Sequence, residues 1–111
     1  MYYSSQQDCN TQTKAIQDPC EIQLLEFDWD DDNVAHCARH GVTPVAAEEV
    51  KDGLPKFFLN DPGKTGTHIM IGPDASGRHW TIVIMPTSHP GQWRPITGWP
   101  SDKAEILKYN G

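Results

Sequence analysis

The stretch THIMIGPDASGRHWTIVIMP, residues 67–86, carries the strongest strand signals in the chain. Its first part alternates polar and apolar residues, which places Ile69 and Ile71 on one face. A Pro-Asp-Ala-Ser-Gly turn follows, and the run that begins at Arg78 is rich in β-branched and aromatic residues. The pattern predicts two strands joined by a tight turn, and therefore an antiparallel hairpin.

Further strands are predicted on both sides of this hairpin. Residues 22–27, IQLLEF, and residues 56–60, KFFLN, are short apolar runs of strand length. Residues 92–99, QWRPITGW, follow a His-Pro-Gly turn and form the final strand. Pro95 lies inside that last strand, which favours an edge position or a bulge because proline has no N–H to donate.

The helices are predicted from capping and periodicity. The acidic cluster after residue 29 suits a helix N-terminus, because carboxylates favour the positive end of the helix dipole. Val34, Cys37 and Ala38 then form one apolar stripe, and Gly41 ends the helix. A second helix begins at Thr43-Pro44 and runs to about residue 51, and a third follows Ser101 over residues 102–109.

The predicted order is β-α-α-β-β-β-β-α, an α+β fold with a small antiparallel sheet and helices packed on one side. Residues 21–111 are expected to form this single domain, because 111 residues with 37% hydrophobic content suit one core. Residues 1–20 are polar and aperiodic, and are expected to be a disordered leader.

Composition also bounds the setting of the protein. No run of about 18 apolar residues is present, so no membrane span is expected, and no secretory signal is visible. The three cysteines form no metal-type pair, and their odd number argues against a disulfide framework. A reducing, cytoplasmic location is therefore predicted. The net charge is −6, but residues 1–32 hold eight acids against one base, whereas residues 33–111 hold seven acids and eight bases. A phosphate-bearing partner is therefore compatible with the second part.

His36 and His40 lie four residues apart on the first predicted helix, nearly opposite its apolar stripe. Such a pair can chelate zinc, but the usual motif carries a Glu after the first His, and here that residue is Cys37. No metal and no other cofactor is therefore predicted. The alternatives are a solvated helix face, or general acid/base and phosphate contacts by exposed imidazoles.

Arg94 lies in the last strand, on the face opposite Trp93. An arginine on a strand is usually a surface ion pair, but RNA cleavage through the 2′-hydroxyl also requires a cation on the developing phosphorane charge. Other candidates for RNA contact are basic side chains that could reach a phosphate and tryptophans that could stack on unpaired nucleobases. The alternatives are exposed polar ends of a hairpin or a solvated helix face for the basic side chains, and core packing for the tryptophans. These candidates are Trp29, Arg78, His79, Trp99 and Lys103.

The segment FDWDDDNVAHCARHGVTPVAAEEV, residues 27–50, resembles the opening of BrnT-type toxins of bacterial type II toxin–antitoxin modules. Downstream, IMIGPDASGR and WRPITGWPSDKAEILKY resemble the strand-turn and the terminal strand and helix of that family. The resemblance covers about residues 24–110. The matching residues of the opening are Phe27, Trp29, Asp30, Asn33, His36, Arg39, His40, Gly41, Val42, Thr43, Glu48 and Glu49.

The resemblance implies a RelE-like fold and metal-independent endoribonuclease activity. It also implies a cognate ribbon-helix-helix antitoxin, and thus a toxin–antitoxin hetero-oligomer. It suggests that His40, Arg94 and the residues around Trp29 and His36 line the site.

The chain departs from the family at three positions that commonly hold a basic residue, which here are Asn33, Thr67 and Trp99. Losing phosphate contacts weakens RNA affinity, because that affinity is largely electrostatic. Two alternatives to an active toxin therefore stay open. One is a catalytically weak or inactive binding module of the same fold, held by an antitoxin or another partner, and the other is a small zinc protein that uses His36, His40 and a distant histidine.

Overall fold

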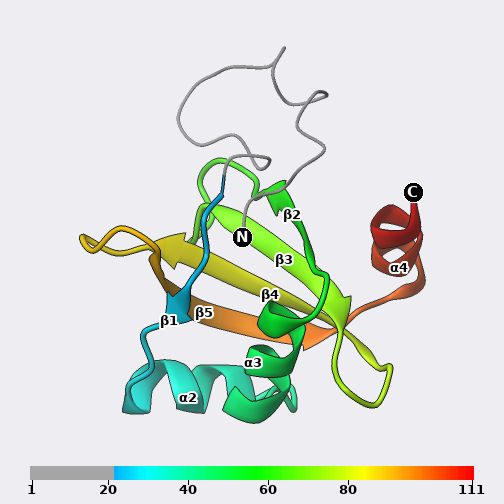
Figure 1. Ribbon diagram of the computed structural model, residues 1–111, viewed down its shortest axis with the longest axis horizontal. Coiled ribbons are helices and arrows are strands. Elements are labelled where there is room, and N and C mark those ends of the chain that lie inside the picture. The colour runs from blue at the N-terminus through cyan, green and yellow to red at the C-terminus, as the bar shows by residue number, and fades with distance from the viewer. Residues whose placement is uncertain (1–21) are drawn as a thin grey trace.

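The computed structural model describes residues 22–111, so the leader predicted over residues 1–20 lies outside it. The described residues form an α+β fold in the predicted element order (Figure 1). Among them, no helix combines the length and the apolar character needed to cross a membrane. The elements are β1 (Glu26–Phe27), α2 (Asp31–Ala38), α3 (Pro44–Asp52), β2 (Lys56–Leu59), β3 (His68–Pro73), β4 (His79–Pro86), β5 (Gln92–Pro100) and α4 (Lys103–Asn110).

The five strands form one sheet in the order β1-β5-β4-β3-β2. Strands β2 to β5 are antiparallel neighbours, and the predicted hairpin is formed by β3 and β4. The prediction of a purely antiparallel sheet is wrong, because β1 runs parallel to β5, with Phe27 opposite Trp93. The N–H of Asp28 donates to the Trp93 carbonyl at 2.8 Å and extends this pairing. The sheet is therefore mixed.

α2 and α3 cover one face of the sheet and enclose the core with it (Figure 1). Both helices pack against central strands, α2 on β5 and α3 on β3 and β4. The main buried side chains between these layers are Phe27, Cys37, Val42, Ala47, Val50, Met70, Trp80, Ile82, Ile84 and Trp93.

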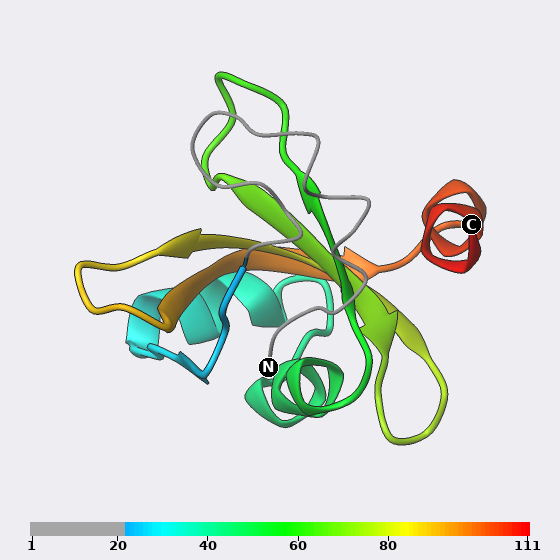
Figure 2. The ribbon, with the colours of Figure 1, turned by 45° about the horizontal axis from the view of Figure 1, so that its top comes forward.

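α4 does not join this helical layer, which corrects the prediction that all helices pack on one side (Figure 2). Phe57 of β2 packs against the core, so its neighbours Lys56 and Phe58 point to the opposite face. α4 contacts those two residues, with Lys108 over the Phe58 ring and the Tyr109 ring beside the Lys56 ammonium. None of the residues of α4 is buried, so this helix contributes no side chain to the core.

β5 contains the bulge that Pro95 predicted. Val83 pairs with Thr97 and Ile84 with Pro95, which leaves Ile96 as the extra residue on β5. Trp93 is 3% exposed and lies in the core, whereas the Arg94 side chain is 29% exposed on the other face. Strand alternation puts Arg94 on the face opposite Trp93, and its guanidinium reaches the link between β1 and α2.

Candidate functional site

The N-terminus of α2 is fixed by a reciprocal capping box. The Asp30 carboxylate accepts from the Asn33 N–H at 3.0 Å, and the Asn33 side-chain oxygen accepts from the Asp30 N–H at 2.8 Å. The Asn33 amide also donates to the Asp28 carbonyl at 2.9 Å. Asn33 is 3% exposed, so its polar groups are satisfied within the protein. The buried face of α2 therefore differs from the predicted apolar stripe of Val34, Cys37 and Ala38. The buried residues of this helix are Asn33 and Cys37, and Ala38 is exposed.

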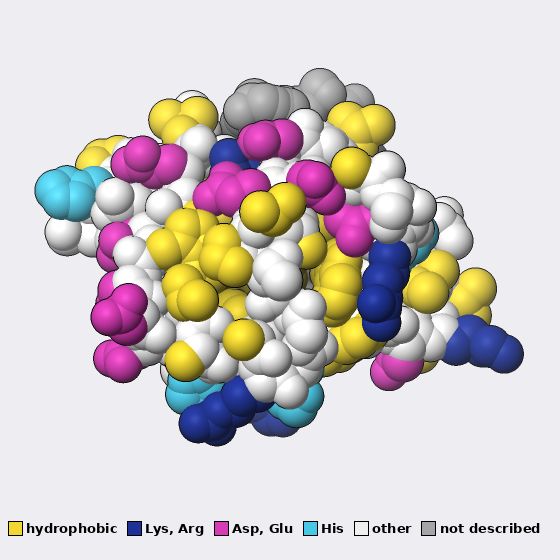
Figure 3. All heavy atoms as spheres, turned by 90° about the horizontal axis from the view of Figure 1, so that it is seen from below, with side chains coloured by type: hydrophobic (Ala, Val, Ile, Leu, Met, Phe, Trp, Pro, Cys, Tyr) yellow, Lys and Arg dark blue, Asp and Glu magenta, His cyan; other side chains and the backbone are white. Residues whose placement is uncertain are grey.

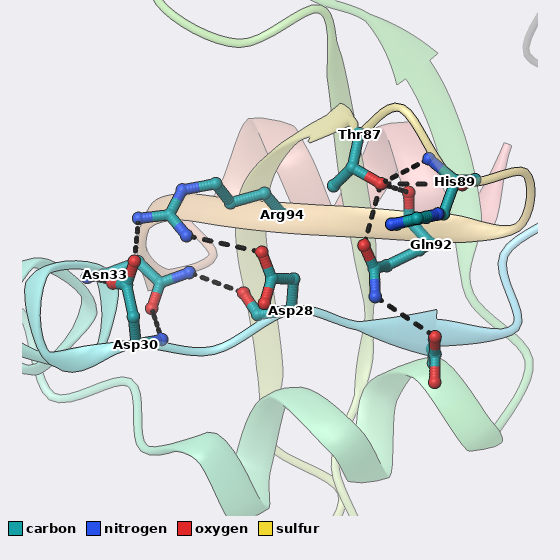
Figure 4. Close-up of polar contacts among 8 residues, drawn as sticks. Asp28, Asp30, Asn33, Thr87, His89, Gln92 and Arg94 are labelled. Atoms are coloured by element: carbon teal, nitrogen blue, oxygen red, sulfur yellow. Dashed lines mark hydrogen bonds and ion pairs between the residues drawn. The ribbon is translucent and has the colours of Figure 1, made fainter.

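Arg94 binds the carboxylates that flank this cap (Figure 4). Its Nη2 lies 2.7 Å from Asp30 Oδ2, and its Nη1 lies 3.7 Å from Asp28 Oδ2. The Asn33 N–H and then the Arg94 guanidinium hold the pKa of Asp30 below its usual value. Arg94 thus links β5 to the start of α2, and a phosphate would compete there with two carboxylates.

The two histidines lie at the other end of α2. His36 is in the last turn, and the helical path continues through Arg39, so that the His40 N–H donates to the Cys37 carbonyl at 3.3 Å. His36, Arg39 and His40 are all exposed. α2 ends at Ala38, so His40 lies two residues beyond the helix and four residues after His36 in the sequence.

Arg78 is exposed immediately before β4. Its guanidinium stacks on the Trp80 ring at 4.7 Å from the ring centroid. A Cβ atom built on Gly41 would lie 4.0 Å from the edge of that ring. Arg78 therefore packs on the indole whose edge approaches Gly41, the residue that follows His40. We call His36, Arg39, His40 and Arg78 the histidine–arginine cluster.

The predicted catalytic residues are thus divided between the two ends of α2. From Asp30, which binds Arg94, to His36 the helix rises by about 9 Å at ~1.5 Å per residue. Figure 3 shows acidic side chains along the left edge of the molecule, on the side where α2 begins, and histidines with Arg or Lys side chains along the lower edge. The sequence placed Arg39 only within a family motif and gave it no role. Its position between two exposed histidines was the feature that could have suggested a role for this arginine.

The remaining RNA-contact candidates lie elsewhere, and most are engaged. Trp29 donates its indole N–H to Glu48 at 3.0 Å and packs edge-on against Phe27. Trp99 donates to the Glu105 carboxylate at 3.1 Å. His79 packs edge-on against Tyr109 of α4, with ring centroids 5.2 Å apart, and Lys103 is exposed at the start of that helix. His79 and Trp99 therefore border α4, of which Lys103 is the first residue.

The zinc alternative requires a third ligand beside the two histidines. Between residues 22 and 111, no three His, Cys, Asp or Glu side chains are placed to hold a metal ion together. Cys37, which lies next to His36 in the sequence, is fully buried, and burial raises the pKa of its thiol to about 11. Its sulfur is therefore a core atom.

The chain matches no protein-family model, no curated protein and no solved structure. The resemblance to BrnT-type toxins therefore rests on the sequence motifs. The histidine–arginine cluster rests on the geometry described above.

Proposed function

We propose that the protein is a metal-independent endoribonuclease toxin of a type II toxin–antitoxin module, with the histidine–arginine cluster as its site. The observation that carries this proposal is the pair of exposed histidines at the C-terminal end of α2, with His36 in its last turn, His40 just beyond it and the exposed Arg39 between them in the sequence. RNA cleavage without a metal needs a base, an acid and a cation, and these are the side chains that the cluster offers.

The reaction is transphosphorylation. One imidazole, neutral at the start, takes the proton of the 2′-hydroxyl while that oxygen attacks the adjacent phosphorus. The bond from phosphorus to the 5′-oxygen breaks, and the other imidazole, protonated at the start, gives its proton to the leaving oxygen. The products are a 2′,3′-cyclic phosphate and a free 5′-hydroxyl. The guanidinium groups of Arg39 and Arg78 offset the negative charge on the non-bridging oxygens.

Arg94 takes a different part in this proposal. Its guanidinium already binds the carboxylates of Asp28 and Asp30 at the far end of α2. We therefore assign it as a positioning residue, which acts through α2 by anchoring the helix that carries His36. The resemblance adds the expected partner, a cognate ribbon-helix-helix antitoxin, and the cytoplasmic setting.

A second candidate function is a catalytically inactive RNA-binding or protein-binding module of the same fold. The observation in its favour is that Asn33 stands, with its amide satisfied, where the family commonly has a lysine. With Thr67 and Trp99 also in place of basic residues, the surface has fewer phosphate contacts than the family pattern implies.

The test is cleavage of a 5′-fluorescein-labelled single-stranded RNA by the full chain, purified without partners and assayed in EDTA. We expect cleavage to 2′,3′-cyclic phosphate ends, and no cleavage of the 2′-deoxy analogue. His36→Ala and His40→Ala are expected to lower the rate by about 10²–10⁴-fold each. The matched control is His89→Ala, an exposed histidine in the β4–β5 loop, which is expected to keep the wild-type rate.

The outcomes separate the two candidate functions. A folded wild type that leaves the RNA intact, but binds it less tightly after Arg39→Ala, supports the binding module and refutes the enzyme. Cleavage that survives the His36→Ala/His40→Ala double substitution refutes the assigned site. If Arg94 is a positioning residue, Arg94→Ala lowers the rate and the melting temperature together, with little change in KM.

A further inference from the structure

Arg78 presents a planar cation at the start of β4. The residue is exposed, and none of the carboxylates among residues 22–111 forms an ion pair with it. Arg94, by comparison, is held by the carboxylates of Asp28 and Asp30. The guanidinium of Arg78 therefore has its N–H groups and its charge available for a ligand.

One side of this cation is covered by an indole ring. The Arg78 Cζ atom lies 4.7 Å from the centroid of the Trp80 ring, a distance at which a guanidinium is attracted to the face of the ring. Trp80 is only 5% exposed, so its ring is part of the core and not a mobile surface group. Because Arg78 itself is exposed, the side of the guanidinium that faces away from Trp80 is open to solvent.

The carboxylate of Asp74 fixes both members of this pair. Its Oδ2 accepts from the Trp80 indole N–H at 2.9 Å, and its Oδ1 accepts from the backbone N–H of Arg78 at 3.0 Å. The Arg78 carbonyl in turn accepts from the Asp74 N–H at 2.8 Å. The ring and the backbone that carries the cation are thus set before any ligand arrives, which lowers the ordering cost of binding.

The same indole borders the α2–α3 link. A Cβ atom built on Gly41 would lie 4.0 Å from the Cη2 atom of Trp80. Gly41 directly follows His40, a member of the histidine–arginine cluster. A ligand that rests on Arg78 is therefore carried by the indole that adjoins the residue after His40.

A guanidinium that is backed on one face and open on the other suits an unpaired nucleobase. Single-stranded RNA is recognised through unstacked bases, which stack on aromatic rings or on arginine planes. The N–H groups lie in the guanidinium plane, so a base on its face leaves them free for phosphate oxygens. An ammonium has no such plane, although Lys51, Lys56 and Lys108 also lie over aromatic rings. Within the described residues, the planar cation and the aromatic backing coincide at Arg78.

We propose that Arg78, backed by Trp80, is a nucleobase subsite on which one unpaired base of a single-stranded nucleic acid stacks. The inference rests on the proposed function for the assignment of this base to the strand whose phosphate lies at the histidine–arginine cluster. The base covers the open face of the guanidinium, and the in-plane N–H groups donate to the phosphate. A duplex keeps its bases paired and stacked within the helix, so this subsite selects single strands.

The test measures how much of the affinity depends on the base. The full chain is titrated into two fluorescein-labelled single strands of equal length, one made of deoxyadenosine nucleotides and one of abasic deoxyribose units. Both strands lack the 2′-hydroxyl that cleavage requires, and both carry the same phosphate charge. In fluorescence anisotropy, the wild type should bind the adenine strand about ten-fold more tightly than the abasic strand.

Three variants separate stacking from charge. Arg78→Lys keeps the positive charge but lacks the plane, so it should bind the two strands about equally, with wild-type affinity for the abasic strand. Arg78→Ala should bind the abasic strand more weakly as well, because it loses a phosphate contact. The matched control is Lys64→Ala, which removes an exposed positive charge between β2 and β3 and should keep the preference for adenine. Circular dichroism checks that all three variants are folded.

The outcomes also distinguish this inference from the proposed function. A wild type that cleaves RNA but binds the two strands equally refutes the subsite and leaves the endoribonuclease in place. A preference for adenine that Arg78→Lys removes, in a protein that leaves RNA intact, supports the subsite and assigns it to the binding module. A preference that survives Arg78→Lys places the base elsewhere and overturns the inference, as does the absence of binding to either strand by the folded wild type.

Discussion

Replacing Asn33 with alanine should destabilise the fold more than its small size suggests. The Asn33 side chain makes two hydrogen bonds to backbone groups, to the Asp30 N–H at 2.8 Å and to the Asp28 carbonyl at 2.9 Å. Alanine removes both, while Asp30 keeps its own bond to the N–H of residue 33. The change therefore isolates one half of the capping box together with the link to Asp28.

The magnitude follows from the polar groups that lose their partners. A backbone group left without a partner in a partly buried position costs about 1–3 kcal/mol, so two such groups give about 2–6 kcal/mol. For a domain of this size, 1 kcal/mol lowers the melting temperature by about 4–8 °C. Asn33→Ala should therefore melt at least about 8 °C below the wild type.

Thermal melting followed by circular dichroism, with a urea titration at 25 °C, measures this effect. The matched control is Asp32→Ala, an exposed residue in the same turn of α2, which should change stability by no more than about 0.5 kcal/mol. Asn33→Lys restores the residue type common in the family and should be at least as harmful as alanine, because the ammonium would enter a site that is 3% exposed. A lysine variant as stable as the wild type would refute the structural role of Asn33.

Two further predictions concern the turns. Gly66→Ala should lower the free energy of unfolding in urea by about 1–3 kcal/mol more than Gly63→Ala does. The new Cβ of residue 66 would clash with Val83 Cγ1, at 2.3 Å, whereas Gly63 has a similar φ and open space around it. Equal costs would show that no clash occurs. Hydrogen bonds, of which the one from the Trp80 indole is the most important, hold the pKa of Asp74 well below its usual value. The Asp74 carboxylate therefore stabilises the fold above about pH 4, and this stabilisation is lost as the pH falls through the lowered pKa. Asp74→Asn should therefore be less stable than the wild type at pH 7, with a difference that shrinks towards pH 2, and a constant difference would contradict the assignment.

The parts of the fold that follow from local sequence were predictable. The β3–β4 hairpin is one of them, because alternation and turn residues act over neighbouring positions. The direction of β1 and the side taken by α4 were not, since a two-residue strand and a helix without buried residues carry no local signal of their long-range partners. Asn33 was missed because the stripe was sought among apolar residues only. The spacing Asp30-x-x-Asn33, a variant of the capping box, was the available signal.

The site could be predicted by residue type but not by arrangement. His36 and His40 are both exposed, but α2 ends at Ala38, so only His36 lies on the helix on which both were predicted. Arg94 was placed on the correct face of its strand, but its partners Asp28 and Asp30 come from a segment more than sixty residues away in the sequence. Only the tertiary fold brings them together. The grouping of Arg78 with the link after His40 likewise depends on the position of Trp80.

The distribution of charge along α2 supports placing RNA at its C-terminal end. The start of the helix holds Asp30, Asp31 and Asp32, which suit the positive end of the helix dipole and repel phosphate. A phosphate bound at Arg94 would have to approach this acidic end and displace two carboxylates from the guanidinium. At the other end, Arg39 lies among exposed imidazoles with no acidic partner among the described residues, so a phosphate displaces only water there. In the proposed function, the eight-residue helix therefore separates the Arg94 anchor at its start from the proposed reacting groups, of which His36 lies in its last turn.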